Sequence, residues 1–155
     1  MAAGAAGRCV EIESADSLWT GRFMAMGSPC EVLLDTASRD TALSVSNAVA
    51  AEAWRIEDKF SRYLDGNIMH RINTASGHPV EVDEETANLL DFAGTLHELS
   101  DGRFDVTSGV LREVWRFDGS DRIPDTAAVA AMLARVGWGR VSWKRPVLTL
   151  SLIHI

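Results

Sequence analysis

The chain has 155 residues, of which 46% are apolar and 24% charged, proportions that allow a globular domain with its own core and argue against disorder. The net charge of -7 argues against a nucleic-acid partner, because a nucleic-acid surface needs clustered lysine and arginine. No apolar run reaches the length of a membrane span, and the two cysteines, Cys9 and Cys30, are too few for a disulfide framework.

Residues 1–19 are rich in alanine and glycine at first and then acidic, and they lack the long apolar core of a secretory signal. We therefore expect residues 1–19 to be a poorly ordered N-terminal segment and the chain, as written, to be cytoplasmic. A periplasmic protein or a membrane-anchored lipoprotein stays open as an alternative if a signal preceded Met1.

The next segment, "WTGRFMAMGSPCEVLLDT", alternates between apolar and polar residues around the break "MGSP". This pattern predicts two short strands, Thr20–Met26 and Cys30–Asp35, joined by a turn at Gly27–Pro29.

A long amphipathic helix is predicted from Asp40 to Phe60, where alanine and glutamate are abundant and neither glycine nor proline interrupts. Its apolar stripe is formed by Val45, Val49, Ile56 and Phe60, with Ala48 and Ala53 between them.

The rest of the chain predicts alternating short elements. Asp83 is a good N-cap for a helix over Glu84–Leu99, which ends at Asp101–Gly102. The other expected elements are a helical turn at "IMHRIN", an extended stretch at "GHPVEV", a helix capped by Thr107 or Ser108, a helix in "IPDTAAVAAMLARVGW" and two strands in "RVSWKRPVLTL". This order predicts an α+β fold in which helices pack on one face of an antiparallel sheet.

Generic motifs give little. The four histidines form no HxH, HxxxH or HExxH pair, and neither a GxSxG elbow, a P-loop nor a GxGxxG sequence occurs. Two local features have both a bland and a functional interpretation. Gly27 permits close approach of a ligand, but a simple hairpin turn explains it better. Tyr63, the single tyrosine, could stack on a planar ring, although a tyrosine lying across a helix end is the better explanation by itself.

The third feature is "SDGRFDVTSG". Asp105 and Thr107 precede a predicted helix N-terminus, where backbone N–H groups point outward and can donate hydrogen bonds to a phosphate, and where Asp105 could accept hydrogen bonds from a base or flavin edge. Helix capping by Thr107 explains the pattern equally well.

Together these pieces resemble the ApbE family of FAD:protein FMN transferases. The matching motifs, in family order, are "MGSP" at Met26–Pro29, "FSRY" at Phe60–Tyr63, "RIN" at Arg71–Asn73, "GRFDVTSG" at Gly102–Gly109, "VWRF" at positions 114–117 and "LARVGWGRV" at Leu133–Val141. Each motif is short, but six of them in this order are specific, and they cover about residues 23–150.

The resemblance implies a reaction: FMN is transferred from FAD to a threonine or serine hydroxyl of an acceptor protein, with release of AMP and with Mg²⁺ offsetting the pyrophosphate charge. It also implies FAD contacts for Met26, for Tyr63 as a stacking ring, and for Arg103, Phe104 and Asp105, which would hold the dinucleotide.

Three positions depart from the family pattern. Ser28 replaces a threonine and keeps the hydroxyl, Arg103 stands where a small residue is common, and Arg116 replaces a glycine. The family's element Asp-x-Gly-Gly-x-x-Lys-Gly and its later metal-binding residues have no match here. The catalytic residues therefore stay unknown, and no residue of this chain is assigned to the metal.

The resemblance predicts an incomplete ApbE-like fold without its C-terminal half, and hence weak or absent FAD binding and no transfer by this chain. Residues 20–149 are predicted to be the N-terminal part of the flavin transferase domain. Residues 150–155 match a translated transposon-end adapter and are predicted to be an adapter-derived tail. The alternative is a non-catalytic α+β domain that binds a nucleotide or another protein.

Overall fold

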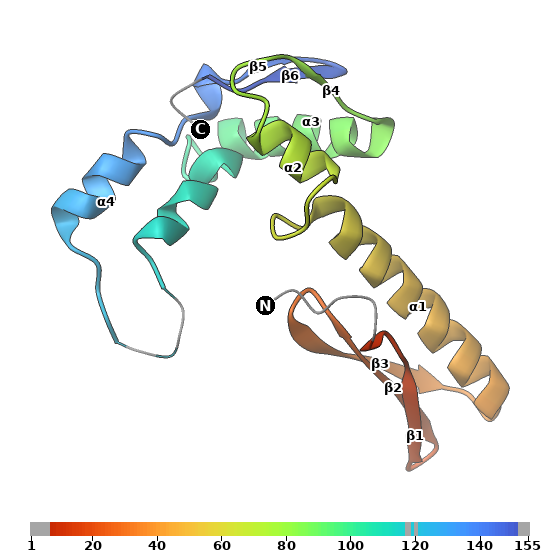
Figure 1. The fold of residues 1–155 in the computed structure, drawn as a ribbon. Helices are drawn as coiled ribbons and strands as arrows, with labels where there is room; N and C mark the ends of the chain where they lie inside the picture. Colours follow the sequence, from red (N-terminus) through yellow and green to blue (C-terminus); the bar gives the residue numbers. More distant parts are fainter. Residues whose placement is uncertain (1–6, 117–118, 120, 152–155) are drawn as a thin grey trace. The chain divides into compact units, whose positions relative to one another are not determined.

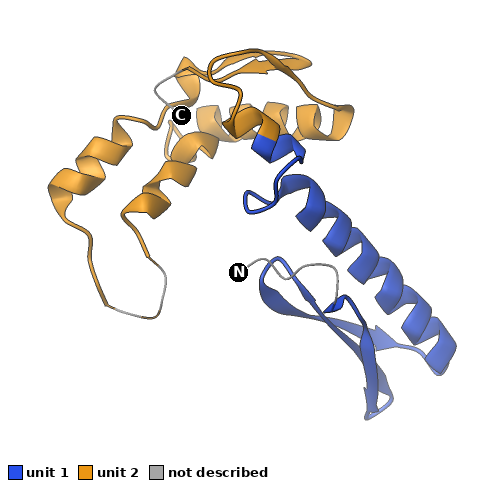
Figure 2. Cartoon of the chain, viewed as in Figure 1, with its two compact units in different colours: residues 1–70 blue, residues 71–155 orange. Residues whose placement is uncertain are grey.

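The computed structural model describes residues 7–116, 119 and 121–151, which fall into two compact units, residues 1–70 and 71–155 (Figure 2). Strands and helices are mixed in both units (Figure 1), as the predicted α+β class requires. The predicted boundaries at residues 19 and 149 stay predictions, and positions 152–155 of the predicted tail lie outside the described residues.

Unit 1 contains a three-stranded antiparallel sheet of order β1-β2-β3, formed by β1 (Glu11–Ala15), β2 (Leu18–Ala25) and β3 (Ser28–Asp35). The prediction of the two later strands is confirmed with small shifts at their ends. Strand β1 corrects the expectation of a poorly ordered segment for residues 11–15, because each of them pairs with β2, from Glu11 opposite Arg22 to Ala15 opposite Leu18.

Helix α1 (Arg39–Phe60) covers one face of this sheet (Figure 1). Ser38 caps it by accepting a hydrogen bond from the Thr41 N–H, which satisfies one free donor of the first turn. The buried residues of this helix are the small residues Ala42, Ser46 and Ala50. The predicted stripe is therefore only partly correct: Val45 and Val49 lie exposed on the helix surface, whereas Ala53 packs against the core cluster of unit 1 and Ile56 and Phe60 are half-buried.

Helix α1 buries small residues because it approaches the sheet closely. Phe23 and Ala25 of β2 form a core cluster with Ala50, and the Phe23 ring meets the Trp54 ring edge-on at 5.9 Å between centroids. At Gly21 the approach is closest, because a Cβ atom there would lie 2.2 Å from Ser46 Oγ. Small side chains let the backbones meet, and the valines cannot occupy that space.

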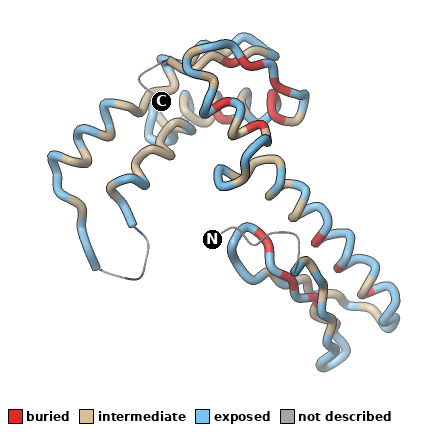
Figure 3. Tube along the Cα trace, in the orientation of Figure 1, coloured by how far each residue is buried: buried red, intermediate tan, exposed pale blue. Residues whose placement is uncertain are grey.

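Unit 2 is built on helix α3 (Glu84–Leu99) and a small antiparallel sheet of order β4-β6-β5 (Figure 1). The strands are β4 (Val80–Glu81), β5 (Ser142–Lys144) and β6 (Val147–Thr149). Asp83 caps α3 as predicted, by accepting the Thr86 N–H. The buried apolar residues of unit 2, coloured in Figure 3, come from helices α2 and α3, from strands β4 and β6 and from the link between β4 and α3: Ile72, Val80, Val82, Ala87, Ala93 and Leu148.

The remaining elements are helix α2 (Ile68–Asn73), whose residues span the division between the units, the 3-10 helices η2 (Val106–Glu113) and η3 (Trp138–Arg140), and helix α4 (Thr126–Leu133). The helix after "RFDV" is thus of the 3-10 type. Its N-cap is Asp105, which corrects the prediction of Thr107 or Ser108.

Candidate functional site

The predicted contact residue Met26 lies in the two-residue turn between β2 and β3. Met26 and Gly27 have φ angles of 54° and 73°, the positive values that a tight hairpin turn of the primed type requires. Met26 is 60% exposed, so its side chain contributes little to the core of unit 1. A flexible, polarisable side chain is thereby displayed on a fixed turn.

Two side chains of α1 hold this turn through its main chain. The Met26 N–H donates to Glu57 Oε1 at 2.9 Å, and the Trp54 indole N–H donates to the Met24 carbonyl at 2.7 Å. Sequence reasoning missed both residues. One signal was present, because Glu57 lies in the last turn of a helix, where the helix dipole disfavours a carboxylate unless it has another partner.

Tyr63 lies in the loop that follows α1 and is 73% exposed. Asn67 closes this loop: its side-chain amide donates to the carbonyls of Asp58 and Ser61 at 3.0 and 2.6 Å, and its oxygen accepts the His70 N–H at 2.9 Å. The Tyr63 N–H donates to Ser61 Oγ at 3.2 Å. An exposed ring on a pinned loop is able to stack on a planar ligand.

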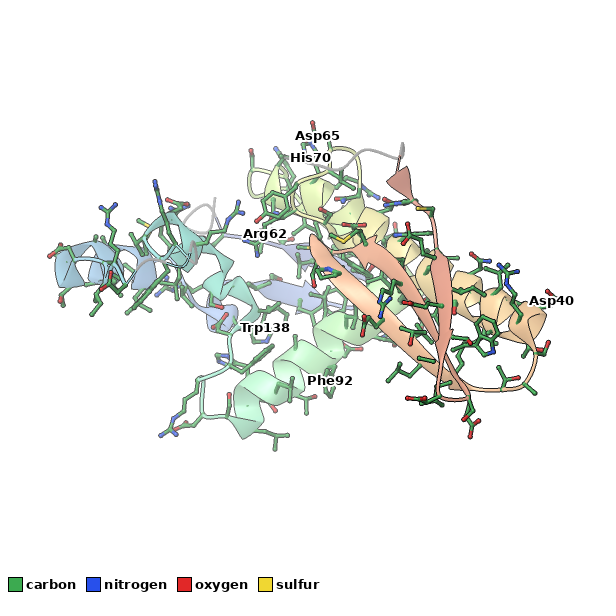
Figure 4. The ribbon with its side chains drawn as sticks, turned by 90° about the horizontal axis from the view of Figure 1, so that it is seen from below. Asp40, Arg62, Asp65, His70, Phe92 and Trp138 are labelled. Atoms are coloured by element: carbon green, nitrogen blue, oxygen red, sulfur yellow. The ribbon has the colours of Figure 1, made fainter. Side chains whose placement is uncertain are left out.

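The structure brings Met26 and Tyr63 to the same end of α1. Glu57, which binds Met26, lies in the last turn of the helix, and Tyr63 follows its final residue Phe60 after two residues. In Figure 4 this end of α1 can be found by the labelled residues Arg62, Asp65 and His70. Asp65 Oδ1 and His70 Nδ1 lie 3.1 Å apart.

The other three predicted contact residues, Arg103, Phe104 and Asp105, form the loop after α3 in unit 2. The Phe104 N–H donates to Ser100 Oγ at 2.8 Å, and the Phe104 carbonyl lies 3.0 Å from His97 Nδ1. Arg103 and Phe104 are exposed. This loop therefore presents one guanidinium and one aromatic ring, with its main chain fixed by α3.

Asp105 differs from these neighbours because its side chain is only 8% exposed. One carboxylate oxygen accepts the backbone N–H and the hydroxyl of Thr107 at 2.8 and 2.6 Å, and the other accepts the Trp138 N–H at 2.8 Å. Thr107 Oγ1 in turn accepts the Gly137 N–H at 2.8 Å. Asp105 thus joins the loop after α3 to the segment that begins η3.

These contacts determine the charge state of Asp105. Burial by itself raises the pKa of the carboxyl group, but the hydrogen bonds from Thr107 and Trp138 and the nearby His97 ring outweigh it. The net effect lowers the pKa of Asp105 below its ordinary value, so the carboxylate stays ionised at neutral pH.

A cavity of about 490 Å³ in unit 2 lies between α3 and the segment from Trp138 to Trp143. None of the five predicted contact residues is among the described residues that line it. Within the described part of the chain, no group of three or more histidine, cysteine, aspartate or glutamate side chains is arranged to hold a metal ion. We assign none of these residues to Mg²⁺.

The fold and these two loops define an α+β chain with exposed aromatic, methionine and guanidinium groups on loops held through their main chain. The sequence model of the ApbE family matches residues 26–153, and the chain belongs to this family. No match was found among the curated proteins. No helix within the described ranges has the length and apolar character needed to cross a membrane.

Solved structures that share the fold include the following three. The ApbE protein from Thermotoga maritima is 28% identical, with a TM-score of 0.72 over 86% of this chain and 44% of that chain. The flavinyl transferase ApbE from Pseudomonas stutzeri is 20% identical, with a TM-score of 0.66 over 93% of this chain and 45% of that chain. The flavin transferase ApbE from Vibrio cholerae is 21% identical, with a TM-score of 0.69 over 87% of this chain and 46% of that chain. The chain spans less than half the length of each of these structures.

Proposed function

We propose that the chain is part of an FAD:protein FMN transferase and that it supplies contacts to FAD. The observation that supports this most is the display of Met26 and Tyr63, both more than half exposed, at one end of α1 with the main chain of each held by hydrogen bonds. A flavin is a planar, largely apolar ring system that such side chains bind by stacking and van der Waals contact.

In the proposed reaction, a threonine or serine hydroxyl of an acceptor protein attacks the phosphorus on the FMN side of the FAD pyrophosphate. A new P–O bond to the acceptor forms, the pyrophosphate P–O bond breaks, and AMP leaves with the electron pair while the hydroxyl proton is released. When bound, Mg²⁺ would supply charge neutralisation at the pyrophosphate. The residues of this chain are assigned to binding: Met26 and Tyr63 to the flavin, and Arg103, Phe104 and Asp105 to the loop that holds the dinucleotide.

The roles within that loop follow from its contacts. Arg103 is exposed and carries a charge that attracts phosphate, and Phe104 offers a ring edge or face. Asp105 has both carboxylate oxygens engaged by internal donors, so we assign it to holding the loop rather than to direct side-chain contact. The cytoplasmic location stays a prediction from the sequence.

The FAD contact is tested by NMR, because the chain has a single tyrosine and selective labelling gives one ring signal. We expect FAD and FMN to shift the Tyr63 signal and AMP to leave it in place. Since an aromatic contact contributes about 1 kcal/mol, Tyr63→Ala should weaken FAD binding by about fivefold, whereas Tyr63→Phe should keep it. Equal shifts with AMP, or full affinity in Tyr63→Ala, would contradict the assignment.

The transfer step is tested separately, by incubating the chain with FAD, Mg²⁺ and an acceptor protein and measuring the mass of the acceptor. We expect weak FAD binding and no transfer, because no described residue is assigned to the metal that neutralises the pyrophosphate. Covalent flavin on the acceptor would show that this chain contains the catalytic groups.

A further inference from the structure

We propose that Glu57 is a positioning residue, which fixes the Met26 turn in the conformation that meets the flavin. The inference rests on the proposed function, since it assigns to Glu57 a role that acts through Met26. It concerns only unit 1, where the turn and helix α1 are joined by direct contacts.

The Met26 turn needs a partner for two reasons. A residue with a Cβ atom is strained at a φ of 54°, and such a conformation persists where surrounding contacts hold it. In a two-residue hairpin the N–H of the first turn residue also points away from the partner strand. Glu57 Oε1 accepts this N–H at 2.9 Å, so one carboxylate oxygen meets both needs.

Glu57 is itself held in place from the N-terminal side. Its second oxygen lies 3.3 Å from Arg8 Nη2, and Arg8 also binds Asp58 at 2.6 Å and lies over the Trp54 ring at 5.7 Å from its centroid. Trp54 holds the end of β2 through the Met24 carbonyl. The tip of the hairpin is therefore fixed at two main-chain atoms by neighbouring turns of α1.

The Glu57 contact holds the main chain of Met26, whose side chain stays exposed. Because the Met26 side chain is largely in solvent, what the Glu57 contact fixes is the direction in which that side chain leaves the turn. Fixing a contact group before the ligand arrives lowers the conformational cost of binding. Tyr63, at the same end of α1, is pinned through its own loop by Asn67, so both proposed flavin contacts are ordered in advance.

The test compares Glu57→Ala with Glu57→Gln and with the neighbouring variant Asp58→Ala. Glu57→Ala removes the acceptor of the Met26 N–H. Glu57→Gln keeps an oxygen acceptor without the charge, and Asp58→Ala removes the other partner of Arg8 while leaving the Met26 contact in place. Two quantities are measured in the full chain: the exchange rate of the Met26 amide proton and the dissociation constant for FAD, followed by the methionine methyl signals. Circular dichroism melting confirms that each variant is folded.

We expect Glu57→Ala to speed the Met26 amide exchange by about tenfold and to weaken FAD binding by about fivefold, because one hydrogen bond to a charged acceptor is lost. Glu57→Gln and Asp58→Ala should stay within about twofold of the parent chain in both measurements. A uniform loss of stability would instead move Asp58→Ala together with Glu57→Ala.

The two failures are distinguishable. If FAD binds to all variants equally, the positioning role is overturned while the proposed function stands. If the parent chain shows no FAD-induced shift, the proposed function and the flavin part of this inference fall together, and the amide exchange still decides whether Glu57 holds the turn. An unchanged exchange rate in Glu57→Ala would overturn the structural part as well.

Discussion

The loop at Met26 in unit 1 and the loop at Asp105 in unit 2 are both held through main-chain hydrogen bonds to a carboxylate, but the carboxylate has a different origin in each. In the first, the motif residue is exposed and a carboxylate from another element, Glu57, holds its main chain. In the second, the motif carboxylate is itself buried and holds the main chain of Thr107 and Trp138. The comparison shows that membership of a family motif does not tell which residues are exposed and which build the loop.

The most disruptive change acts on the packing beneath the first loop. We expect Gly21→Ala to destabilise unit 1 by about 3 kcal/mol, because its Cβ would lie 2.2 Å from Ser46 Oγ and 2.6 Å from Ser46 Cβ. Hydrogen exchange read on peptides from each unit measures the effect. Gly139→Ala is a useful control, since no atom lies within 4 Å of a Cβ at Gly139. Equal exchange changes in the two variants would contradict the packing explanation.

The second change acts on the carboxylate that builds the other loop. Asp105→Asn keeps the shape of the side chain but loses charged acceptors for two backbone N–H groups, so we expect a loss of about 2 kcal/mol from unit 2. Exposed Asp101→Asn, four residues earlier, is the matched control and should change the free energy of unfolding by less than about 0.5 kcal/mol.

This carboxylate also predicts a pH dependence. The pKa of Asp105 is lowered in the folded chain, so its stabilising effect is complete above the unfolded pKa of about 3.9 and is lost as the pH falls through the lower folded value. The pKa values of Asp58 and Asp91 are also lowered by their hydrogen-bond partners. Their contributions to the pH dependence are the same in the parent chain and in the Asp105→Asn variant. The stability difference between the parent chain and Asp105→Asn should therefore shrink below about pH 4, as urea unfolding at several pH values would show. A difference that stays constant with pH would contradict an ionised Asp105.

The smallest expected effect has the opposite sign. Within the described residues Ser46 is fully buried, and its hydroxyl has no hydrogen-bond partner. Replacing it by alanine removes an unsatisfied polar atom from the α1–β2 contact, so we expect Ser46→Ala to stabilise unit 1 by about 0.5–1 kcal/mol. Thermal melting measures this change, and a clear decrease in melting temperature would show that the hydroxyl has an interaction that the structure does not reveal.

Much of the secondary structure was determined by the sequence itself. Helices α1 and α3 begin where Ser38 and Asp83 cap them and end near the polar breaks, because local propensity and capping act within a few residues. The glycine of the hairpin likewise indicates a turn, although the turn lies at Met26–Gly27 rather than at the predicted Gly27–Pro29, since Ser28 and Pro29 belong to β3. The order of short motifs was enough to indicate the family that the comparison then established.

Tertiary structure decided which side of each element is used. Val45 and Val49 form the more apolar stripe of α1, yet the residues it buries are Ala42, Ser46 and Ala50, because Gly21 lets the two backbones meet there. The strand Glu11–Ala15 exists because β2 offers it an edge, a contact that no local pattern contains. The same holds for Glu57 and Asp105. A sequence shows that a carboxylate is present, but whether it binds a ligand or a backbone N–H depends on which donors the folded chain brings within reach.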